Sequence, residues 1–508
     1  MISGIVSGER HLAKPEFEAR IAKVASGFAA LGAGPGTSVA ILLRNDFDFL
    51  VASLAAQRIG AYAVPVNWHS SPSEVGYVLA DCDAKILVAH ADLLAPLGAA
   101  VPAATRVVAV ATPPEIRAAY RLGESHARPA GALDWESWLG TFAPYDGPPV
   151  AQTMSMIYTS GTTGHPKGVR RVPPTVEQQR GLDEQRRIIN GLEPGVRGLV
   201  PGPLYHAAPN SFALRGARIA DLMVLLPRFE PEAFLAAIER HRITTLFMVP
   251  VMFVRLLKLP EAVRRRYDLS SLKFVMHAAA PCAPDVKRAM LDWWGPIVWE
   301  FYGGTDIGAV SLISGEDWLR KPGSVGRPTP GTTLKILDDD GRELAPGEIG
   351  EVFARVACYP DFTYHKAPAK RAEVERDGLI TAGDMGYLDA DGYLFLCDRK
   401  RDMVISGGVN IYPAEIEAVA ITMPGLKDCA VFGVPDDEFG EALMMLVEPM
   451  DGHTLDPQAV RAHLARQLAG FKVPRTIEIR TGLPREDSGK IFKRRLREPY
   501  WEKAGRKI

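Results

Sequence analysis

The sequence predicts an α/β protein, with a large N-terminal domain of mixed and parallel sheets and helices followed by a small α+β C-terminal domain. Three observations support this fold class. Continuous apolar runs alternate with amphipathic helical segments over the first 150 residues. From residue 332 the pattern changes to short strands and tight turns. The chain has 508 residues, whereas a single domain usually has about 100–200.

The first part of the chain predicts strands that alternate with helices. Residues 15–32 repeat apolar side chains at a spacing of three to four, which predicts a helix that ends at the GAGPG segment. Residues 38–43 form an apolar run typical of a buried strand, 46–60 predict a second helix, and 61–66 and 84–89 predict further strands. Such alternation predicts parallel sheets with helices packed on their faces.

The middle of the chain continues this mixture and then becomes rich in β-structure. Residues 244–253 and 272–280 predict buried strands that run into loops. Between about 332 and 396, the DDDG and DADG turns separate short alternating strands, which predicts a small antiparallel sheet or a β-barrel-like subdomain.

The last 110 residues mix helices with strands. Residues 413–422 and 457–468 predict helices, and 429–434 and 442–448 predict strands. The charged segment CDRKRDM at 397–403 lies between two apolar strands and is the best candidate linker. We therefore expect an N-terminal domain over 1–398 and a C-terminal domain over 399–508.

Composition narrows the class of protein. The 59 basic and 60 acidic residues give a net charge of −1, which argues against a protein that mainly coats nucleic acid or anionic lipid. The five cysteines are scattered without a CxxC pair, as expected for isolated thiols in a reducing compartment. The N-terminus carries charges where a signal peptide needs an apolar stretch, and no 18 apolar residues run together. We expect a soluble, cytoplasmic enzyme without a transmembrane segment.

The most informative segment is a loop rich in glycine and hydroxyl groups at 156–168, with the sequence MIYTSGTTGHPKG. Glycines allow close backbone approach, and amide and hydroxyl groups can line a concavity for phosphate oxygens, to which Lys167 adds a positive charge. The segment is not a Walker loop, because Gly168 stands where that motif needs Ser or Thr. It also lacks the GxGxxG pattern of dinucleotide-binding proteins.

TSGTTGHPKG resembles the phosphate loop of the adenylate-forming superfamily, which includes acyl- and aryl-CoA ligases, nonribosomal adenylation domains and luciferases. The resemblance covers essentially the whole chain, because further signatures of the family follow in order. It implies that this loop binds the phosphates of ATP or AMP through Thr159, Ser160, Gly161, Thr162, Thr163, Gly164 and Lys167.

The segment Phe301–Asp306, FYGGTD, resembles the YGxTE signature of the family. The resemblance implies that Tyr302 stacks on adenine beside Gly303, that Thr305 contacts the α-phosphate and that Asp306 binds Mg²⁺. A hard cation that bridges phosphates needs such a carboxylate. The family usually has glutamate here, so we expect Asp306 to reach the ion after a backbone shift or through a water.

Two later segments resemble the ribose and hinge signatures. TAGD at 381–384 is similar to the family's TGD, which implies that Asp384 accepts both ribose hydroxyls. DRKRD at 398–402 is similar to the hinge between the two domains. There the resemblance implies that Arg399 reaches ribose or phosphate and that Arg401 is the pivot about which the small domain turns.

The C-terminal part carries two more signatures. PREDSGK at 484–490 resembles the loop whose lysine enters the site, which implies that Lys490 bridges the attacking carboxylate and the α-phosphate. SGGVNIYPAE at 406–415 resembles the lining of the pantetheine tunnel, where Gly407 and Gly408 would let the thiol arm of CoA pass.

The acid pocket is expected from three further segments. By resemblance, His206 gates or lines the acyl site, and the other lining residues are Met252, Phe253, Ala278 and Ala279, while Ala280 and Pro281 flank adenine. No lysine, arginine or aspartate stands in these segments to hold an α-amino group or a second carboxylate. This favours hydrophobic acids, whether fatty, alicyclic or aromatic.

Together these signatures predict an ATP-, Mg²⁺- and CoA-dependent acid–CoA ligase of the acyl-CoA synthetase type. It would form an acyl-adenylate and pyrophosphate, then the CoA thioester and AMP. A stand-alone enzyme that loads a separate acyl carrier protein, a luciferase-like oxygenase and a catalytically weakened nucleotide-binding protein stay open as alternatives. A homodimer is compatible with the sequence, which does not identify the acid.

Overall fold

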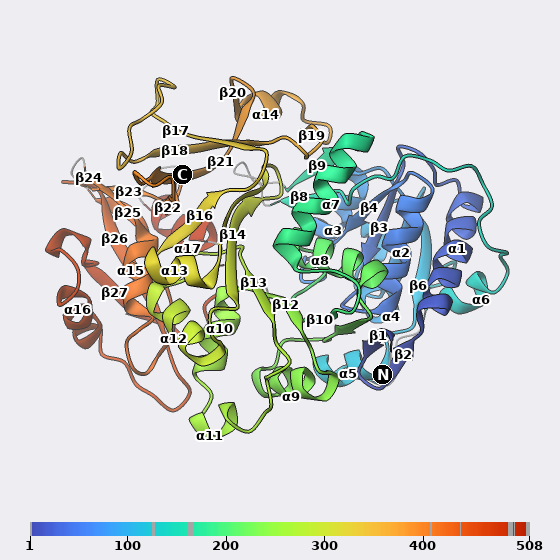
Figure 1. Cartoon of the computed structure of the whole chain (residues 1–508), viewed down its shortest axis with the longest axis horizontal. Coiled ribbons are helices and arrows are strands. Elements are labelled where there is room, and N and C mark those ends of the chain that lie inside the picture. Colours follow the sequence, from blue (N-terminus) through green and yellow to red (C-terminus); the bar gives the residue numbers. More distant parts are fainter. Residues whose placement is uncertain are drawn as a thin grey trace.

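The computed structural model describes residues 3–123, 128–159, 166–406, 409–436, 438–485, 491 and 493–503. It has the predicted α/β architecture (Figure 1). The first sheet is parallel, in the order β4-β3-β5-β6-β7. Its strands are Tyr62–Pro65, Ser38–Leu42, Ala84–His90, Arg106–Val110 and Leu133–Asp134. Helices α1 (Lys14–Ala30) and α2 (Phe47–Arg58) come from the two segments expected to be helical.

A second sheet contains the strands that position the cavity. Its parallel part runs β1-β11-β10-β12-β13-β14. These strands are Gly4–Ser7, Leu222–Leu225, Arg197–Val200, Thr245–Met248, Phe274–His277 and Val298–Gly304. β2 (Arg10–Leu12) pairs antiparallel with β1 at one edge. The apolar runs fit such strands because both faces of the sheet are covered by helices.

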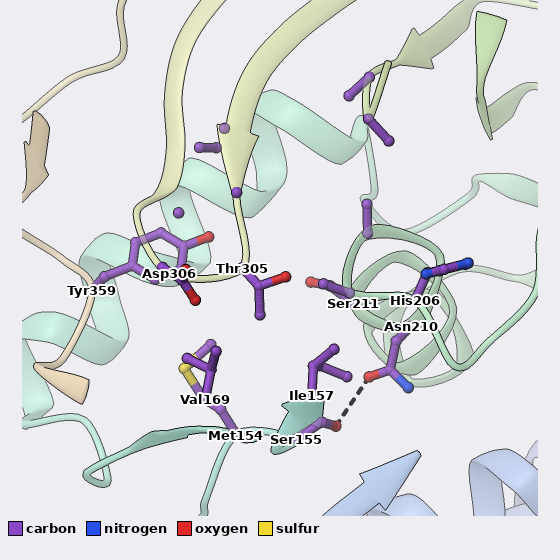
Figure 2. A pocket seen from close by; sticks show the side chains of 18 of the residues that line it. Met154, Ser155, Ile157, Val169, His206, Asn210, Ser211, Thr305, Asp306 and Tyr359 are labelled. Atoms are coloured by element: carbon purple, nitrogen blue, oxygen red, sulfur yellow. Dashed lines mark hydrogen bonds between the residues drawn. The ribbon is translucent and has the colours of Figure 1, made fainter. Parts of the chain in front are cut away.

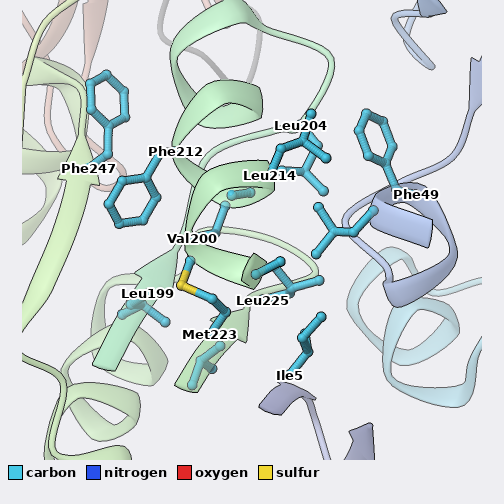
Figure 3. Packing of buried hydrophobic residues seen from close by; sticks show 14 of the residues in the cluster. Ile5, Phe49, Leu199, Val200, Leu204, Phe212, Leu214, Met223, Leu225 and Phe247 are labelled. Atoms are coloured by element: carbon cyan, nitrogen blue, oxygen red, sulfur yellow. The ribbon is translucent and has the colours of Figure 1, made fainter. Parts of the chain in front are cut away.

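Helices α2 and α8 (Ala207–Ile219) lie between the two sheets (Figure 1). Figure 3 shows Phe49 of α2 and Leu214 of α8 in the same cluster as Leu199 of β10 and Met223 of β11. All four side chains are buried. The shared core therefore fixes α8, which carries part of the site, relative to both sheets.

The expected strand over 244–253 is wrong in its second half. β12 ends at Met248, and helix α10 covers Pro250–Leu257. Pro250 is at the start of the helix, where a missing N–H costs nothing and the fixed φ suits the first turn. Met252 and Phe253 therefore lie on a helix rather than on a strand.

The β-rich stretch continues the second sheet through antiparallel pairs in the order β14-β15-β16-β22-β21-β18-β17. β15 is Gly308–Ile313, β16 Ser324–Pro328, β17 Thr332–Leu337, β18 Gly350–Val356, β21 Leu379–Leu388 and β22 Leu394–Arg399, with β20 (Glu375–Arg376) on β21. Among the described residues this path stays open, so the stretch is an antiparallel extension rather than a closed barrel.

A small sheet, β19-β9-β8, brings the predicted phosphate loop to the β-rich stretch. β8 is Ile157–Thr159, β9 is Lys167–Arg171 and β19 is Phe362–Tyr364. The hairpin partners β8 and β9 flank the predicted loop. Helix α7 (Val176–Asn190) follows β9 and begins with a capping box made by Thr175 and Gln178.

The C-terminal part forms a sheet of its own, β24-β23-β26-β25 with β27 on β26. The strands are Val409–Ile411, Val404–Ser406, Gly440–Pro449, Leu426–Asp436 and Thr476–Ile479, and helices α15 (Pro413–Ala420) and α16 (Pro457–Ala465) pack with them. Lys258 Nζ, at the end of α10, donates to the carbonyls of Leu426 and Lys427, both at 3.0 Å. No helix in the described part of the chain is long and apolar enough to cross a membrane.

Candidate active site

A cavity of about 970 Å³ opens at the carboxyl ends of the parallel strands. Gly202 follows β10, Val249 follows β12, Ala278 follows β13 and Thr305 follows β14, and all four residues line it. Open parallel sheets bind ligands at this edge because the loops after the strands converge there.

The structure brings most of the described candidate residues to this cavity. Those that line it are Thr159, Lys167, His206, Met252, Ala278, Ala279, Gly303, Thr305, Asp306, Arg399 and Arg401. They come from segments more than 200 residues apart in the chain, as the predicted order of signatures requires. Ser160, Gly161, Thr162, Thr163, Gly164, Gly407, Gly408 and Lys490 lie outside the described residues.

Phe253 does not line the cavity. It is fully buried, and its ring lies 5.1 Å from the ring of His277 and 6.3 Å from that of Trp294. Successive residues of an α-helix point about 100° apart, so Met252 and Phe253 cannot both face the cavity. The family resemblance implied that Phe253 lines the acid pocket, but the helix directs this side chain into the core.

Tyr302 and Asp384 bond to each other beside the cavity. The Tyr302 hydroxyl donates to Asp384 Oδ2 at 2.7 Å, and Arg399 Nε lies 3.5 Å from Oδ1. Neither residue is part of the cavity wall, although Gly303, Gly383 and Arg399 are. Ala280 and Pro281 also lie outside the wall. Burial raises the pKa of Asp384, while Arg399 and the tyrosine hydroxyl oppose this shift.

Asp306 has a buried carboxylate with one oxygen still unused. Oδ2 accepts a hydrogen bond from the Tyr364 hydroxyl at 3.0 Å, and Oδ1 is buried with no donor among the described residues. Burial raises the pKa of this carboxyl. A buried, unpaired carboxylate oxygen is costly unless a cation or a donor uses it, so Asp306 fits Mg²⁺ despite its shorter side chain.

Lys167 lies near the Asp306 carboxylate, and Tyr364 contacts both residues. Its ammonium is 5.0 Å from the centre of the Tyr364 ring, whose hydroxyl bonds Asp306. Burial lowers the pKa of Lys167, and nearby Lys370 acts in the same direction. Lys167 thus presents a partly desolvated charge to the part of the cavity that Thr305 and Asp306 line, which suits phosphate oxygens.

Arg171 is a site residue that the sequence analysis missed. It is buried at the end of β9, where Nη2 donates to the carbonyls of Thr305 at 3.0 Å and Asp306 at 2.5 Å, and Nη1 donates to Pro360 O at 2.6 Å. Burial lowers its pKa. Arg171 thereby ties the strand after the phosphate loop to the turn that carries Asp306. Its spacing was a usable signal, because side chains four residues apart on a strand, such as Lys167 and Arg171, share a face.

The opposite part of the cavity is lined by α8 and by the segment before β8. Figure 2 shows Asn210, near the start of α8, directed at Ser155, and Ser211 of the same helix directed toward Thr305. His206, at the N-cap of α8, also lines the cavity. Ser155 Oγ donates to Asn210 Oδ1 at 3.0 Å, and Asn210 is buried. We call the part of the cavity beside α8 the acid chamber. Apolar side chains that line the cavity are Met154, Ile189, Leu214, Phe247, Met248 and Met252.

Charged side chains also reach this chamber from α7 and α8, which the sequence analysis did not foresee. Asp183 and Arg186 come from α7, and Arg215 and Arg218 come from α8. Each pair is three residues apart and so lies on one helix face. The segments expected to line the pocket contain no such charges, but the packing of the two helices adds them.

Known proteins share this organisation over the whole chain. A model of the AMP-binding enzyme family matches residues 5–358, and a model of the AMP-binding enzyme C-terminal domain matches 415–490. The chain is 34% identical to feruloyl-CoA synthase of Amycolatopsis sp over 97% of this chain and 95% of that protein. It is 31% identical to indoleacetate–CoA ligase of Aromatoleum aromaticum over 96% and 93%, respectively. The solved structure of the amide bond synthetase McbA from Marinactinospora thermotolerans matches with a TM-score of 0.80 and 28% identity, covering 98% of this chain and 96% of that one.

The fold and the cavity define an enzyme that handles a nucleotide at the carboxyl edge of a parallel sheet. The chain belongs to the AMP-binding enzyme family. This confirms the resemblance to adenylate-forming enzymes that the sequence signatures indicated.

Proposed function

We propose that this chain is an AMP-forming acid–CoA ligase that activates a carboxylic acid with an apolar body. The observation that carries this proposal is the continuity of the cavity. Lys167, Thr305 and Asp306 line one part of it, and an apolar chamber beside α8 forms another. An acid in this chamber can present its carboxylate to the α-phosphate of ATP without leaving the cavity.

The chemistry proceeds in two displacements. A carboxylate oxygen attacks the α-phosphorus, the bond to pyrophosphate breaks, and an acyl-adenylate forms. The CoA thiol then loses its proton and attacks the acyl carbonyl, and AMP leaves. Neither step needs a nucleophilic side chain, so the enzyme acts by orienting the reactants and stabilising charge.

The described residues take distinct parts in this scheme. Asp306 would hold Mg²⁺, which neutralises charge on the phosphate oxygens when it is bound. In the described part of the chain, no group of three or more His, Cys, Asp or Glu side chains could hold a metal. This accords with an ion that takes its other ligands from phosphates and water. Lys167 and the Thr305 hydroxyl would contact phosphate, and Arg399 would contact ribose or phosphate.

The small domain supplies the remaining parts of the proposal. We assign residues 1–398 to acid and ATP binding and 399–508 to a mobile cap that turns about Arg401. Lys490 would act in adenylation, and Gly407 and Gly408 would admit CoA. Support comes from Arg399 and Arg401, which line the cavity from the segment that joins the two parts of the chain.

Free CoA is the proposed acceptor, and a carrier protein is the competing one. We further place the enzyme in the cytoplasm, where ATP and CoA are available and where its free thiols stay reduced. A homodimer is compatible with this role, because each chain has a complete set of signatures.

The test is an acid panel with ATP and Mg²⁺, monitored by pyrophosphate exchange and by AMP release with and without CoA. We expect exchange with apolar acids and CoA-dependent formation of a thioester detectable by mass. Exchange without a CoA thioester would favour the carrier-loading enzyme. No exchange with any acid would favour a nucleotide-binding protein without ligase activity.

A further inference from the structure

One cation in the acid chamber has no carboxylate of its own. Asp183 and Arg186 on α7 and Arg215 on α8 all line this chamber. Arg215 forms the close ion pair with Asp183. Its Nη1 donates to Asp183 Oδ1 at 2.8 Å, and its Nη2 donates to the main-chain carbonyl of Asp183 at 3.0 Å. One carboxylate therefore faces two guanidinium groups, and the hydrogen bond that it accepts comes from Arg215.

Arg186 is left with a distant contact. Its Nη1 lies 4.0 Å from the same Asp183 oxygen, beyond hydrogen-bond distance, and no other described residue accepts from its guanidinium. Its side chain is 21% exposed, and burial lowers its pKa, although arginine stays protonated at any physiological pH. A partly desolvated arginine with free donors favours an anionic ligand.

The walls around Arg186 limit what that ligand can be. Ile189 on α7, Leu214 on α8 and Phe247 at the end of β12 also line the chamber and are buried. A ligand that contacts both Arg186 and these side chains combines an anionic group with an apolar body. Arg218 is a weaker candidate, because it is exposed and its Nη1 lies 3.4 Å from Gln152 Oε1.

We propose that the substrate acid carries a second carboxylate besides the reacting one, and that Arg186 binds it. This inference rests on the proposed ligase function and refines its substrate class to dicarboxylic acids with an apolar spacer. The planar guanidinium can pair with both oxygens of a carboxylate, which gives specificity as well as affinity. Arg186 is thus assigned as a specificity-determining residue.

The test compares acids that share a skeleton and differ at the far end. Terephthalate is set against para-toluate and para-hydroxybenzoate, and linear α,ω-diacids are set against monoacids of the same chain length. We expect the wild-type enzyme to prefer the best diacid over its monoacid by about 10–100-fold in kcat/KM for AMP release, as a charge-assisted hydrogen bond provides.

Variants of Arg186 and Arg187 distinguish a loss of diacid recognition from a general loss of activity. Arg186→Met is expected to abolish the preference for the diacid, so that kcat/KM falls about 10–100-fold more for the diacid than for its monoacid. Arg187→Met removes the same charge from the same helix, but Arg187 is exposed and paired with Glu184, so this control should keep the preference. If Arg186→Met does not fold, Arg186→Gln replaces it, and the wild-type comparison needs no variant.

Each outcome decides the inference. Equal or better activity with monoacids in the wild type overturns it, as does equal loss of both substrates in Arg186→Met. Equal kcat/KM for para-hydroxybenzoate and terephthalate would mean that Arg186 binds a neutral hydrogen-bond acceptor, and the proposal of a second carboxylate would be wrong. If no acid of either series releases AMP, the ligase function itself fails.

Discussion

At the scale of single residues, Arg171 connects three segments that the reaction needs in register. Its guanidinium donates to the main-chain carbonyls of Thr305, Asp306 and Pro360. Its own main-chain carbonyl accepts a hydrogen bond from the Tyr62 hydroxyl at 2.8 Å. Removal of the donors would leave buried carbonyls unpaired and free the Thr305–Asp306 turn to shift. Such a shift would move the Asp306 carboxylate from the position proposed for Mg²⁺ binding, and its short side chain cannot make up the distance.

We therefore predict that Arg171→Met lowers kcat/KM for AMP formation by about 100-fold, since misplacement of a site group by about 1 Å can cost this much. The apparent KM for Mg²⁺ should rise at the same time, and Arg171→Lys should be intermediate. Steady-state kinetics over a Mg²⁺ titration measure both effects.

Arg170 supplies the matched control. It is next to Arg171 on β9, on the other face of the strand, where its guanidinium lies 4.6 Å from the centre of the Tyr62 ring. Arg170→Met should leave the Mg²⁺ dependence unchanged. A purely structural role for Arg171 would instead lower the melting temperature without altering the KM for Mg²⁺.

Ala279 is strained where it lines the cavity. Its φ is +76°, in the left-handed region that costs a non-glycine residue about 1–2 kcal/mol. Ala279→Gly removes this strain but gives the unfolded chain more freedom, so we predict a gain of about 0.5–1 kcal/mol in the free energy of unfolding. Urea denaturation measures it.

The neighbouring Ala278 tests the cause. It is buried and is not in the left-handed region, so Ala278→Gly should destabilise the protein. A loss of stability in both variants would show that the Ala279 methyl contributes more through packing than its conformation costs.

At the scale of elements, strands β13 and β14 and helix α12 (Pro284–Trp294) enclose a buried ionic cluster behind the cavity wall. Lys287 Nζ donates to Glu300 Oε2 at 2.7 Å, and His277 Nε2 lies 3.4 Å from the same oxygen. Burial lowers the pKa of His277 well below 6.5, and nearby Lys287 lowers it further. His277 is therefore neutral in the folded protein at neutral pH.

This predicts an acid-sensitive element. Below pH 6.5 the unfolded chain binds a proton at His277 that the folded chain does not, so stability falls as pH falls. The loss is about 1.4 kcal/mol for each pH unit below 6.5. Denaturation curves at several pH values should show this slope in the wild type and a slope smaller by one proton in His277→Gln.

The exposed His453 provides the comparison. His453→Gln makes the same substitution at a solvent-facing side chain, and an equal change of slope in this variant would show that the effect is not specific to the buried His277. An unchanged slope in His277→Gln would mean that another group controls the acid sensitivity.

Some of the elements could be located from sequence patterns alone. Strands β3, β5 and β12 begin within one residue of their predicted starts, because apolar runs bounded by turn residues admit few alternatives. The pattern could not separate β12 from α10, since both are apolar and only Pro250 marks the change. The segment 244–253 was therefore predicted as one strand.

At the scale of the whole molecule, the proposed mechanism requires the small domain to bring different residues to one cavity. Lys258 bonds the carbonyls at the start of β25, and Arg401 lines the cavity from the connecting segment. We predict that Lys490→Ala abolishes adenylate formation and leaves thioester formation from a supplied acyl-adenylate largely intact. Pyrophosphate exchange measures the first reaction, and thioester yield measures the second.

An unrelated lysine controls for a general effect of charge. Lys335 is partly exposed on β17 and pairs with Glu343, so Lys335→Ala should change neither half-reaction. Equal loss of both half-reactions in Lys490→Ala would contradict the role in adenylation alone.

The fold class and the family could be established from the sequence alone, and the sequence also predicted which residues face the nucleotide. Nucleotide binding uses glycines, hydroxyls and single charges at a fixed spacing, and these residues stand together in short segments. The segments that end at Lys167 and at Asp306 are two examples. Only the tertiary structure decided what surrounds them. Arg171 bonds carbonyls that are distant in the chain, and Arg186 has no close carboxylate among the described residues because Arg215 of another helix bonds Asp183. Whether a charge is paired depends on which helix or turn packs against it.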